Sequence, residues 1–304
     1  MVKEAGRLTL SEVPAPSVTG PDDVLIRVLF AGICRTDLAV ARGQLPAREP
    51  LILGHELSGV VEDLGARVEG LRRGAQVSVD PRIRCGACER CTAGAGPCDR
   101  PQVLGIDRHG AFAELLRVPA SAVVALPAAL PLAVGAYTEP LAAALAVVSA
   151  GLSPSDRLLV AGEGRIALLT ERVLAAHGFD RVTRWHPRQA PPERNGFDAA
   201  IESDPRAEIL ASIIGAVRPR GRVVLKSRAL GPIAIDLGEA VKKELTLSAV
   251  AYGDFHAAVD LLAARRIVVD DLLGPAHPID QFARAFAEAE ASEAKKIFLV
   301  PQAL

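Results

Sequence analysis

The stretch from residue 156 to residue 170, DRLLVAGEGRIALLT, decides the fold of the second half of this chain. It begins with an apolar run typical of a buried strand and ends with a segment of helical periodicity. Between the two, Gly162, Gly164 and Ala167 match the G-x-G-x-x-G/A turn, which brings a pyrophosphate to a helix N-terminus. The stretch therefore predicts a strand, a tight turn and a helix that bind a dinucleotide.

Alternating strand and helix patterns continue to about residue 260, as in a parallel sheet with helices on both faces. In the second strand, Thr183 and Arg184 interrupt the apolar run, which is typical of a strand at the edge of a sheet. The strands are expected at 157–161, 181–185, 197–202, 222–226 and 245–249.

The second strand should end in an acidic residue that holds the adenosine ribose hydroxyls. Instead His186 stands about where the acid belongs, with Arg184 and Arg188 beside it. Loss of the acid and nearby positive charge favour a 2′-phosphate, so we expect NADP slightly ahead of NAD. The alternative is that this end of the domain no longer grips adenosine tightly.

A loop at residues 84–100, RCGACERCTAGAGPCDR, holds four of the five cysteines of the chain. Two spacers of two residues and one of six let this loop fold back and gather the four sulfurs around one point. Tetrahedral structural zinc binds such a set and leaves no position open for substrate. An iron–sulfur cluster and four reduced thiols are the alternatives. The expected ligands are Cys85, Cys88, Cys91 and Cys98.

A second group of metal-binding residue types lies upstream of this loop. Cys34 follows a strand-like run, and His55 and Glu56 follow Gly54, which permits a tight backbone approach. Thiolate, imidazole and carboxylate are the ligands of catalytic zinc. A buried thiol and a hydrogen-bonded histidine would explain Cys34 and His55 equally well if the two residues stood alone.

Several longer motifs occur together with these residues and in a fixed order. They are GICRTDL (32–38), LGHELSGVVEDLGARVEGLRRGAQVSVDP (53–81), the cysteine loop, GAFAELLRVPA (110–120) and TEPLAAAL (138–145). In this order and spacing the sequence resembles the zinc-dependent medium-chain alcohol dehydrogenases, and most of all their polyol, threonine and sugar dehydrogenase branch.

The resemblance implies a catalytic zinc bound by Cys34, His55 and a glutamate, for which Glu56 and Glu139 are both candidates. It also implies that the Thr36 hydroxyl passes the substrate proton and that Asp37 supports the ligands. With the cysteine loop, the chain would hold two zinc ions, one structural and one catalytic.

The same resemblance implies a GroES-like β-barrel catalytic domain and a truncated, Rossmann-like, doubly wound parallel sheet that binds NADP or NAD. We expect the catalytic domain at 1–135, the cofactor domain at 136–262 and a C-terminal return to the catalytic domain at 263–304. Strands are expected at 267–272 and 296–301 in that return.

The chain departs from the family pattern at three places. Ala39 replaces a histidine that often relays the proton to solvent, and Arg35 replaces a small glycine beside Cys34. The segment between Trp185 and Phe197, HPRQAPPERNG, is too short and too rich in proline for the helix, strand and helix that the family normally has there. We therefore expect one βα unit of the sheet to be missing.

Composition and charge limit the kinds of molecule that this protein is expected to bind. A formal net charge of −1 with 50% hydrophobic residues suggests neither a nucleic-acid footprint nor an acidic tail. The start, MVKEAGRLTLSEVP, lacks the apolar core of a signal peptide, and no long uninterrupted apolar stretch suggests a membrane span. We expect a cytoplasmic protein with a small-molecule substrate, and the resemblance implies a homodimer or homotetramer.

The leading functional hypothesis is a zinc-dependent NAD(P) oxidoreductase acting on a secondary alcohol such as a polyol, sugar or amino alcohol. A second hypothesis keeps the zinc and loses the hydride, because zinc as a Lewis acid also serves a lyase or isomerase. Dinucleotide binding would then be weakened or lost. A third is a non-catalytic descendant, against which the retention of Cys34, His55, Glu56 and Glu139 speaks.

Overall fold

The computed structural model describes residues 1–301 except 95 and 292–293. The chain divides into two compact units, one made of Met1–Glu139 with Val268–Leu304 and the other of Pro140–Ile267. Residues 292–293 and 302–304 of the expected C-terminal segment lie outside the described residues.

The first unit is built on the long strand β3 (Asp23–Gly32), which pairs with three other strands of one sheet. The order in this sheet is β10-β6-β5-β3-β17-β16, and β9 also pairs with β3. Its strands other than β3 are β5 (Glu56–Leu64), β6 (Gln76–Val79), β9 (Leu115–Pro119), β10 (Val123–Ala125), β16 (Leu273–Pro278) and β17 (Lys296–Val300). Alternate side chains of β3, Val24, Ile26 and Val28, are fully buried in the core of this unit.

Short elements surround this sheet and carry the residues of interest. The strands β7 and β8 pair with each other and flank the cysteine loop, while α1 follows β3 directly. These elements are β1 (Val2–Glu4), β2 (Arg7–Thr9), α1 (Arg35–Ala41), β4 (Leu51–Ile52), β7 (Arg82–Ile83), α2 (Glu89–Thr92), β8 (Gln102–Val103), α3 (Leu132–Gly135) and α9 (Phe282–Ala291). Helix α4 (Thr138–Leu145) begins in this unit and continues into the second.

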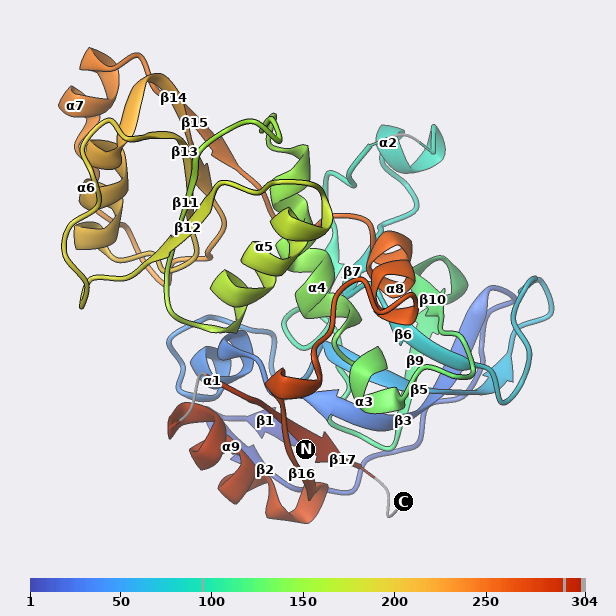
Figure 1. The fold of residues 1–304 in the computed structure, drawn as a ribbon. Helices are drawn as coiled ribbons and strands as arrows, with labels where there is room; N and C mark the ends of the chain where they lie inside the picture. Colours follow the sequence, from blue (N-terminus) through green and yellow to red (C-terminus); the bar gives the residue numbers. More distant parts are fainter. Residues whose placement is uncertain (95, 292–293, 302–304) are drawn as a thin grey trace. The chain divides into compact units, whose positions relative to one another are not determined.

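The second unit contains a five-stranded sheet with the order β12-β11-β13-β14-β15, in which every pair is parallel. Helix α5 contacts β11 and β12, and α6 contacts β13 and β14. The elements are β11 (Leu158–Ala161), α5 (Arg165–Ala176), β12 (Val182–Trp185), β13 (Phe197–Glu202), α6 (Ala207–Ala216), β14 (Val217–Leu225), α7 (Leu237–Lys242), β15 (Thr246–Ala249) and α8 (Phe255–Ala263) (Figure 1).

This sheet confirms the predicted parallel α/β architecture and the predicted edge strand. Every residue of β11 is buried, as expected of an interior strand, whereas Thr183 and Arg184 of the edge strand β12 are exposed. The segment between β12 and β13 contains no helix or strand. The sheet therefore runs directly from its second strand to its third.

One prediction about the C-terminal segment is wrong. Residues 267–272 do not form a strand, because Asp270–Leu272 is a 3-10 turn in which the Leu272 N–H donates to the Val269 carbonyl over 2.9 Å. The turn buries Leu272 and keeps the two aspartates exposed, and the strand β16 begins one residue later. The second predicted strand is confirmed by β17, which pairs antiparallel with β3 and parallel with β16.

One segment, Leu132–Ser149, is long and apolar enough to cross a membrane by composition alone. It runs through α3 and α4, and 72% of it is buried within the fold, as in the core helix of a globular protein.

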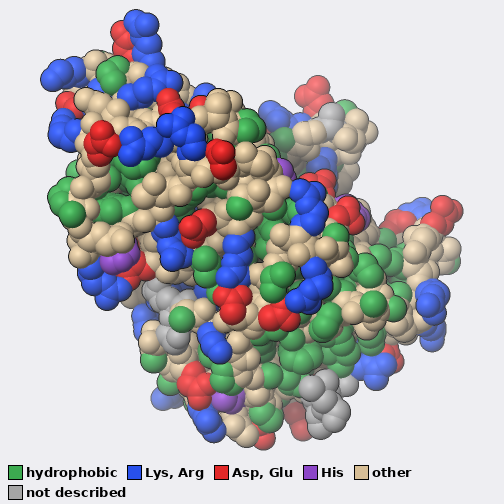
Figure 2. All heavy atoms as spheres, viewed as in Figure 1, with side chains coloured by type: hydrophobic (Ala, Val, Ile, Leu, Met, Phe, Trp, Pro, Cys, Tyr) green, Lys and Arg blue, Asp and Glu red, His purple; other side chains and the backbone are tan. Residues whose placement is uncertain are grey.

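On the face drawn in Figure 2, Lys and Arg side chains are interspersed with Asp and Glu. Several of the exposed arginines pair with carboxylates, for example Arg220 with Glu244 at 2.9 Å.

Candidate functional site

The four cysteines of the loop between β7 and β8 converge as free thiols whose sulfurs lie within 4.8 Å of one another. Cys85 Sγ lies 3.9 Å from Cys91 Sγ, and Cys88 Sγ lies 3.9 Å from Cys98 Sγ. Four sulfurs at about 2.3 Å from a tetrahedral zinc stand about 3.8 Å apart. The sulfur positions therefore fit a closed zinc site and exclude disulfides in this arrangement.

The electrostatics of this loop also favour a cation. Backbone N–H groups of Ala87 and Cys88 lower the pKa of Cys85 to about 6. Desolvation raises the pKa of Cys91 to about 11, so this thiol stays protonated at neutral pH in the absence of a metal. A bound cation would be needed to bring all four sulfurs to the thiolate form together.

Cys34, His55 and Glu56 form the second cluster, with one ligand atom from each within 4.8 Å of the others. Cys34 caps the N-terminus of α1, whereas His55 follows the turn at Gly54 and Glu56 begins β5. His55 and Glu56 are buried and Cys34 is partly buried. The cluster is thus assembled from two segments, the junction of β3 with α1 and the start of β5, which the pairing of Gly32 with Glu56 brings together.

Asp37 connects the backbone segments that carry this cluster. Its Oδ2 accepts the Cys34 N–H over 2.8 Å, and its Oδ1 accepts the Gly54 N–H over 3.1 Å. The same Oδ1 lies 3.4 Å from His55 Nδ1, which is buried and has no hydrogen-bond partner among the described residues. Asp37 is therefore placed to orient the cysteine and the histidine, and a metal would satisfy the ring nitrogen.

The electrostatic environment of the His55 side chain favours a positive charge. Burial alone would lower the pKa of this imidazole, but the Asp37 carboxylate and the Cys34 thiolate outweigh burial and raise the pKa well above its usual value. A buried pocket that attracts a proton so strongly will also attract a divalent cation. The donor set and its field both fit zinc.

The other residues named for this site by the resemblance or as departures from its pattern lie outside this ligand set. Glu139, in the first turn of α4, is buried, yet its carboxylate is not among the atoms within 4.8 Å. Thr36 is half-buried in the first turn of α1, Arg35 is exposed and Ala39 is buried.

Lys296 is a residue of this region that sequence reasoning missed. It begins β17, is buried, and its Nζ pairs with Glu56 Oε2 and lies 3.3 Å from the Ile33 carbonyl oxygen. One weak signal is present in the sequence, a lysine at the start of an otherwise apolar run, KIFLV. A lysine at a strand end is usually exposed, so only the pairing of β17 with β3 reveals its place.

The glycine-rich turn has the geometry that a dinucleotide needs. Gly162 has φ +148°, and a Cβ there would lie 2.1 Å from Ser203 Oγ, so no side chain fits. Gly164 caps α5 and provides no side-chain hydrogen bond to the first turn, which leaves backbone N–H groups there without a capping side chain. Ala167 is fully buried within α5. The turn therefore fits a pyrophosphate at the helix N-terminus.

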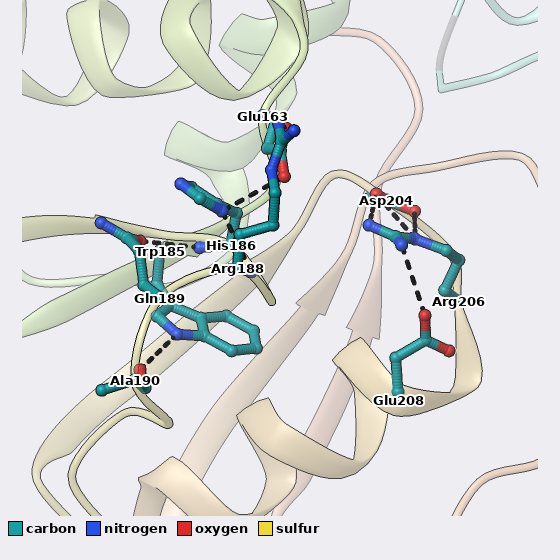
Figure 3. A network of polar contacts seen from close by, with 9 residues as sticks. All are labelled: Glu163, Trp185, His186, Arg188, Gln189, Ala190, Asp204, Arg206 and Glu208. Carbon is teal, nitrogen blue, oxygen red and sulfur yellow. Dashed lines mark hydrogen bonds and ion pairs between the residues drawn. The ribbon is translucent and has the colours of Figure 1, made fainter.

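The residues predicted at the adenosine end lie close to carboxylates, and Figure 3 shows His186 and Arg188 beside Glu163. Arg184 lies 3.4 Å from Glu171 of α5. His186 Nδ1 lies 3.2 Å from Glu163 Oε1, and the Arg188 guanidinium pairs with the other carboxylate oxygen of Glu163. Glu163 stands at the unspecified position between the two glycines of the turn. It is a second residue that sequence reasoning missed.

Comparison with known proteins agrees with this architecture. Residues 20–128 match the alcohol dehydrogenase GroES-like domain. The chain is 28% identical to D-xylulose reductase A of Aspergillus niger over 334 aligned residues, covering 96% of this chain and 93% of that protein. It is 29% identical to L-threonine 3-dehydrogenase of Pyrococcus furiosus, covering 94% of this chain and 92% of that protein.

A solved structure shares the whole fold. A protein described as a zinc-binding dehydrogenase from Sinorhizobium meliloti 1021, bound to NADP, superposes with a TM-score of 0.88 at 27% identity, covering 98% of this chain and 97% of that one. The 334 positions aligned with the xylulose reductase exceed the 304 residues of this chain, so the relative carries residues that this chain lacks. Residues 20–128 are therefore similar to an alcohol dehydrogenase GroES-like domain, and nearly the whole chain is similar to proteins named as xylulose reductase, threonine dehydrogenase and zinc-binding dehydrogenase.

Proposed function

We propose that this protein is a zinc-dependent oxidoreductase that transfers a hydride between NAD(P) and a secondary alcohol or ketone, such as a polyol, a sugar or an amino alcohol. The observation that carries the proposal is the buried set of Cys34, His55 and Glu56, with ligand atoms within 4.8 Å of one another. The relatives named as xylulose reductase and threonine dehydrogenase support hydride transfer over a lyase or isomerase reaction.

In this proposal Cys34 and His55 hold the catalytic zinc together with Glu56 or Glu139. When bound, zinc would supply a Lewis acid that favours the ionised form of an alcohol and polarises a carbonyl near neutral pH. Asp37 holds the Cys34 backbone and the His55 ring in place through the contacts described above. Such supporting contacts orient metal ligands and tune their basicity. The gathered set favours Glu56 as the third ligand.

The proton path cannot use the histidine relay that the resemblance implies, because Ala39 stands at that position. The hydroxyl of the half-buried Thr36, in the first turn of α1, is the group we assign to pass on the substrate proton. Ala39 has no titratable side chain to pass the proton on, so water would complete the path to solvent. In this proposal the four cysteines of the loop take no part in the reaction. They hold a structural zinc ion that stabilises the fold.

The dinucleotide would place its pyrophosphate on the turn Gly162–Gly164 at the N-terminus of α5 and its adenosine near His186. The backbone of the turn can approach closely because Gly162 lacks a side chain. When bound, the nicotinamide would accept or donate the hydride.

Assembly and location form part of the same proposal. We propose a homodimer or homotetramer that forms through the cofactor-binding unit. The edge strand β15 exposes Leu247, and Leu237 and Val241 of α7 are exposed at 59% and 76%. Apolar side chains at a sheet edge favour association. We place the protein in the cytoplasm, because its free thiols suit a reducing compartment.

The test combines metal content, dinucleotide binding and activity. Zinc-loaded protein should hold two zinc ions per chain, show fluorescence changes with NADH or NADPH, and oxidise polyols or amino alcohols. Cys34→Ser should lose one zinc ion and the activity while dinucleotide binding persists. Glu56→Gln and Glu139→Gln, compared by cobalt absorption spectra, identify the third ligand. Full zinc without any response to millimolar dinucleotide would defeat the proposal.

A further inference from the structure

We infer that Glu163 makes this chain prefer NAD(H) to NADP(H). Its carboxylate lies where a 2′-phosphate would bind, and it pairs with Arg188, the cation that the phosphate would need. The inference rests on the proposed function and concerns the adenosine end of the same site. It reverses the expectation, drawn from the sequence, that the positive charges after β12 (Val182–Trp185) favour NADP.

The topology of the sheet brings Glu163 to this end. The strands β11 and β12 are parallel neighbours in which Ala161 stands opposite Trp185. The residues that follow them therefore emerge side by side at the carboxyl edge of the sheet, and the Gly162 N–H donates to the Trp185 carbonyl over 2.9 Å. Glu163 and His186 are consequently neighbours in space although 22 residues separate them in the chain.

Glu163 supplies the acid that the second strand lacks. In dinucleotide-binding folds a carboxylate after this strand accepts the hydrogen bonds of the ribose hydroxyls. Here His186 occupies that sequence position, but Glu163 Oε1 lies 3.2 Å from its Nδ1 (Figure 3). A carboxylate is thus available at the ribose position from a different element, and it suits the free hydroxyls of NAD.

The cation that holds Glu163 is Arg188. The backbone N–H of Arg188 donates to His186 Nδ1 over 3.2 Å, which holds the turn that carries Arg188 close to His186. The Arg188 guanidinium pairs with Glu163 Oε2. A 2′-phosphate would have to replace Glu163 at this guanidinium and would lie beside a like charge.

Two other arginines of this unit also have carboxylate partners. Arg184 lies 3.4 Å from Glu171. Arg206 donates to Asp204 over 2.7 Å (Figure 3). The positive charge that the sequence places around β12 is therefore largely neutralised within the protein. Replacing the Glu163 carboxylate by an amide removes the like charge and releases Arg188 for a phosphate.

The experiment titrates zinc-loaded, full-length protein with NADH and NADPH and follows binding by fluorescence and calorimetry, with no substrate present. The unchanged protein should bind NADH more tightly than NADPH. Glu163→Gln should strengthen NADPH binding about tenfold, as expected when one like charge beside a phosphate is removed, and weaken NADH binding severalfold. Glu163→Gln combined with Arg188→Ala should lose the gain for NADPH.

Glu193→Gln is the matched control, because Glu193 is a carboxylate of the same unit that pairs with Arg157 at 2.9 Å. It should leave the NADH to NADPH ratio unchanged. Tighter binding of NADPH by the unchanged protein, or an unchanged ratio in Glu163→Gln, would overturn this inference alone. Failure of every variant, and of the unchanged protein, to bind either dinucleotide would overturn the proposed function as well.

Discussion

Lys296 forms a buried ion pair with Glu56 of the candidate zinc cluster, and the two side chains are only 4% and 3% exposed. The strands that carry them, β17 and β5, both pair with β3, where Gly32 stands opposite Glu56 and Phe298. A Cβ on Gly32 would lie 2.6 Å from Glu56 Oε2 and 3.0 Å from Lys296 Cδ. The pair therefore lies over a backbone position that has no room for a side chain.

Replacing Lys296 by methionine should destabilise the zinc-free protein by about 3–5 kcal/mol, because it leaves a buried carboxylate without its cation. Added zinc should restore part of the loss, since the metal then supplies positive charge next to Glu56. Urea unfolding with and without chelator measures both effects. Lys295→Met, one residue earlier at an exposed position, is the control. Equal stabilities of the two variants would contradict a structural role for the pair.

Cys88→Ser and Cys34→Ser should each remove one zinc ion per chain but differ in their effect on folding. Cys88 belongs to the loop between β7 and β8, whose four sulfurs we expect a metal to hold in place, so its loss should lower the thermal unfolding temperature by several degrees. Cys34→Ser should leave that temperature nearly unchanged. Zinc analysis and calorimetry on both variants test the division into two sites, which equal losses of stability would refute.

Gly162→Ala should destabilise the protein by about 1–3 kcal/mol and weaken dinucleotide binding, because the new methyl group would clash with Ser203 Oγ. Adding Ser203→Ala should recover part of the stability, since the remaining Cβ contact is 3.4 Å. Gly178→Ala is the control for backbone strain, because Gly178 has φ +82° and open space around it. If Gly162→Ala lowers the free energy of unfolding no more than Gly178→Ala does, the proposed clash with Ser203 is excluded.

Asp198→Asn should lower the free energy of unfolding at neutral pH by about 1 kcal/mol, the size of a lost hydrogen bond. The Arg157 N–H and the Arg218 guanidinium donate to this carboxylate over 2.7 and 2.6 Å and hold its pKa below 3.8. Its contribution is therefore complete above the unfolded value of 3.8 and disappears as the pH falls through the lower folded value.

Denaturant unfolding of the unchanged protein and of Asp198→Asn should be measured from about pH 7 down to about pH 3. The difference between their free energies of unfolding should shrink as the pH falls. A difference in stability that stays constant down to the acid limit would mean that the Asp198 charge is irrelevant.

The sequence determined the local chemistry and the order of the elements. The spacing of Cys85, Cys88, Cys91 and Cys98 sufficed to predict that their sulfurs meet, because the ligands of such a loop are close in the chain. The turn at 162–167 and the polar second strand sufficed for a parallel sheet with β12 at its edge. In each case the deciding interactions span few residues, or follow from hydrophobic periodicity.

The tertiary structure alone decided which distant charges meet. Lys296 reaches Glu56 across 240 residues because β17 and β5 both flank β3, and Glu163 reaches Arg188 because β11 and β12 are parallel neighbours. Strand order places these side chains in contact, and an ion pair leaves no periodic pattern in the sequence. The charge of a site therefore depends on neighbours that only the completed sheet supplies.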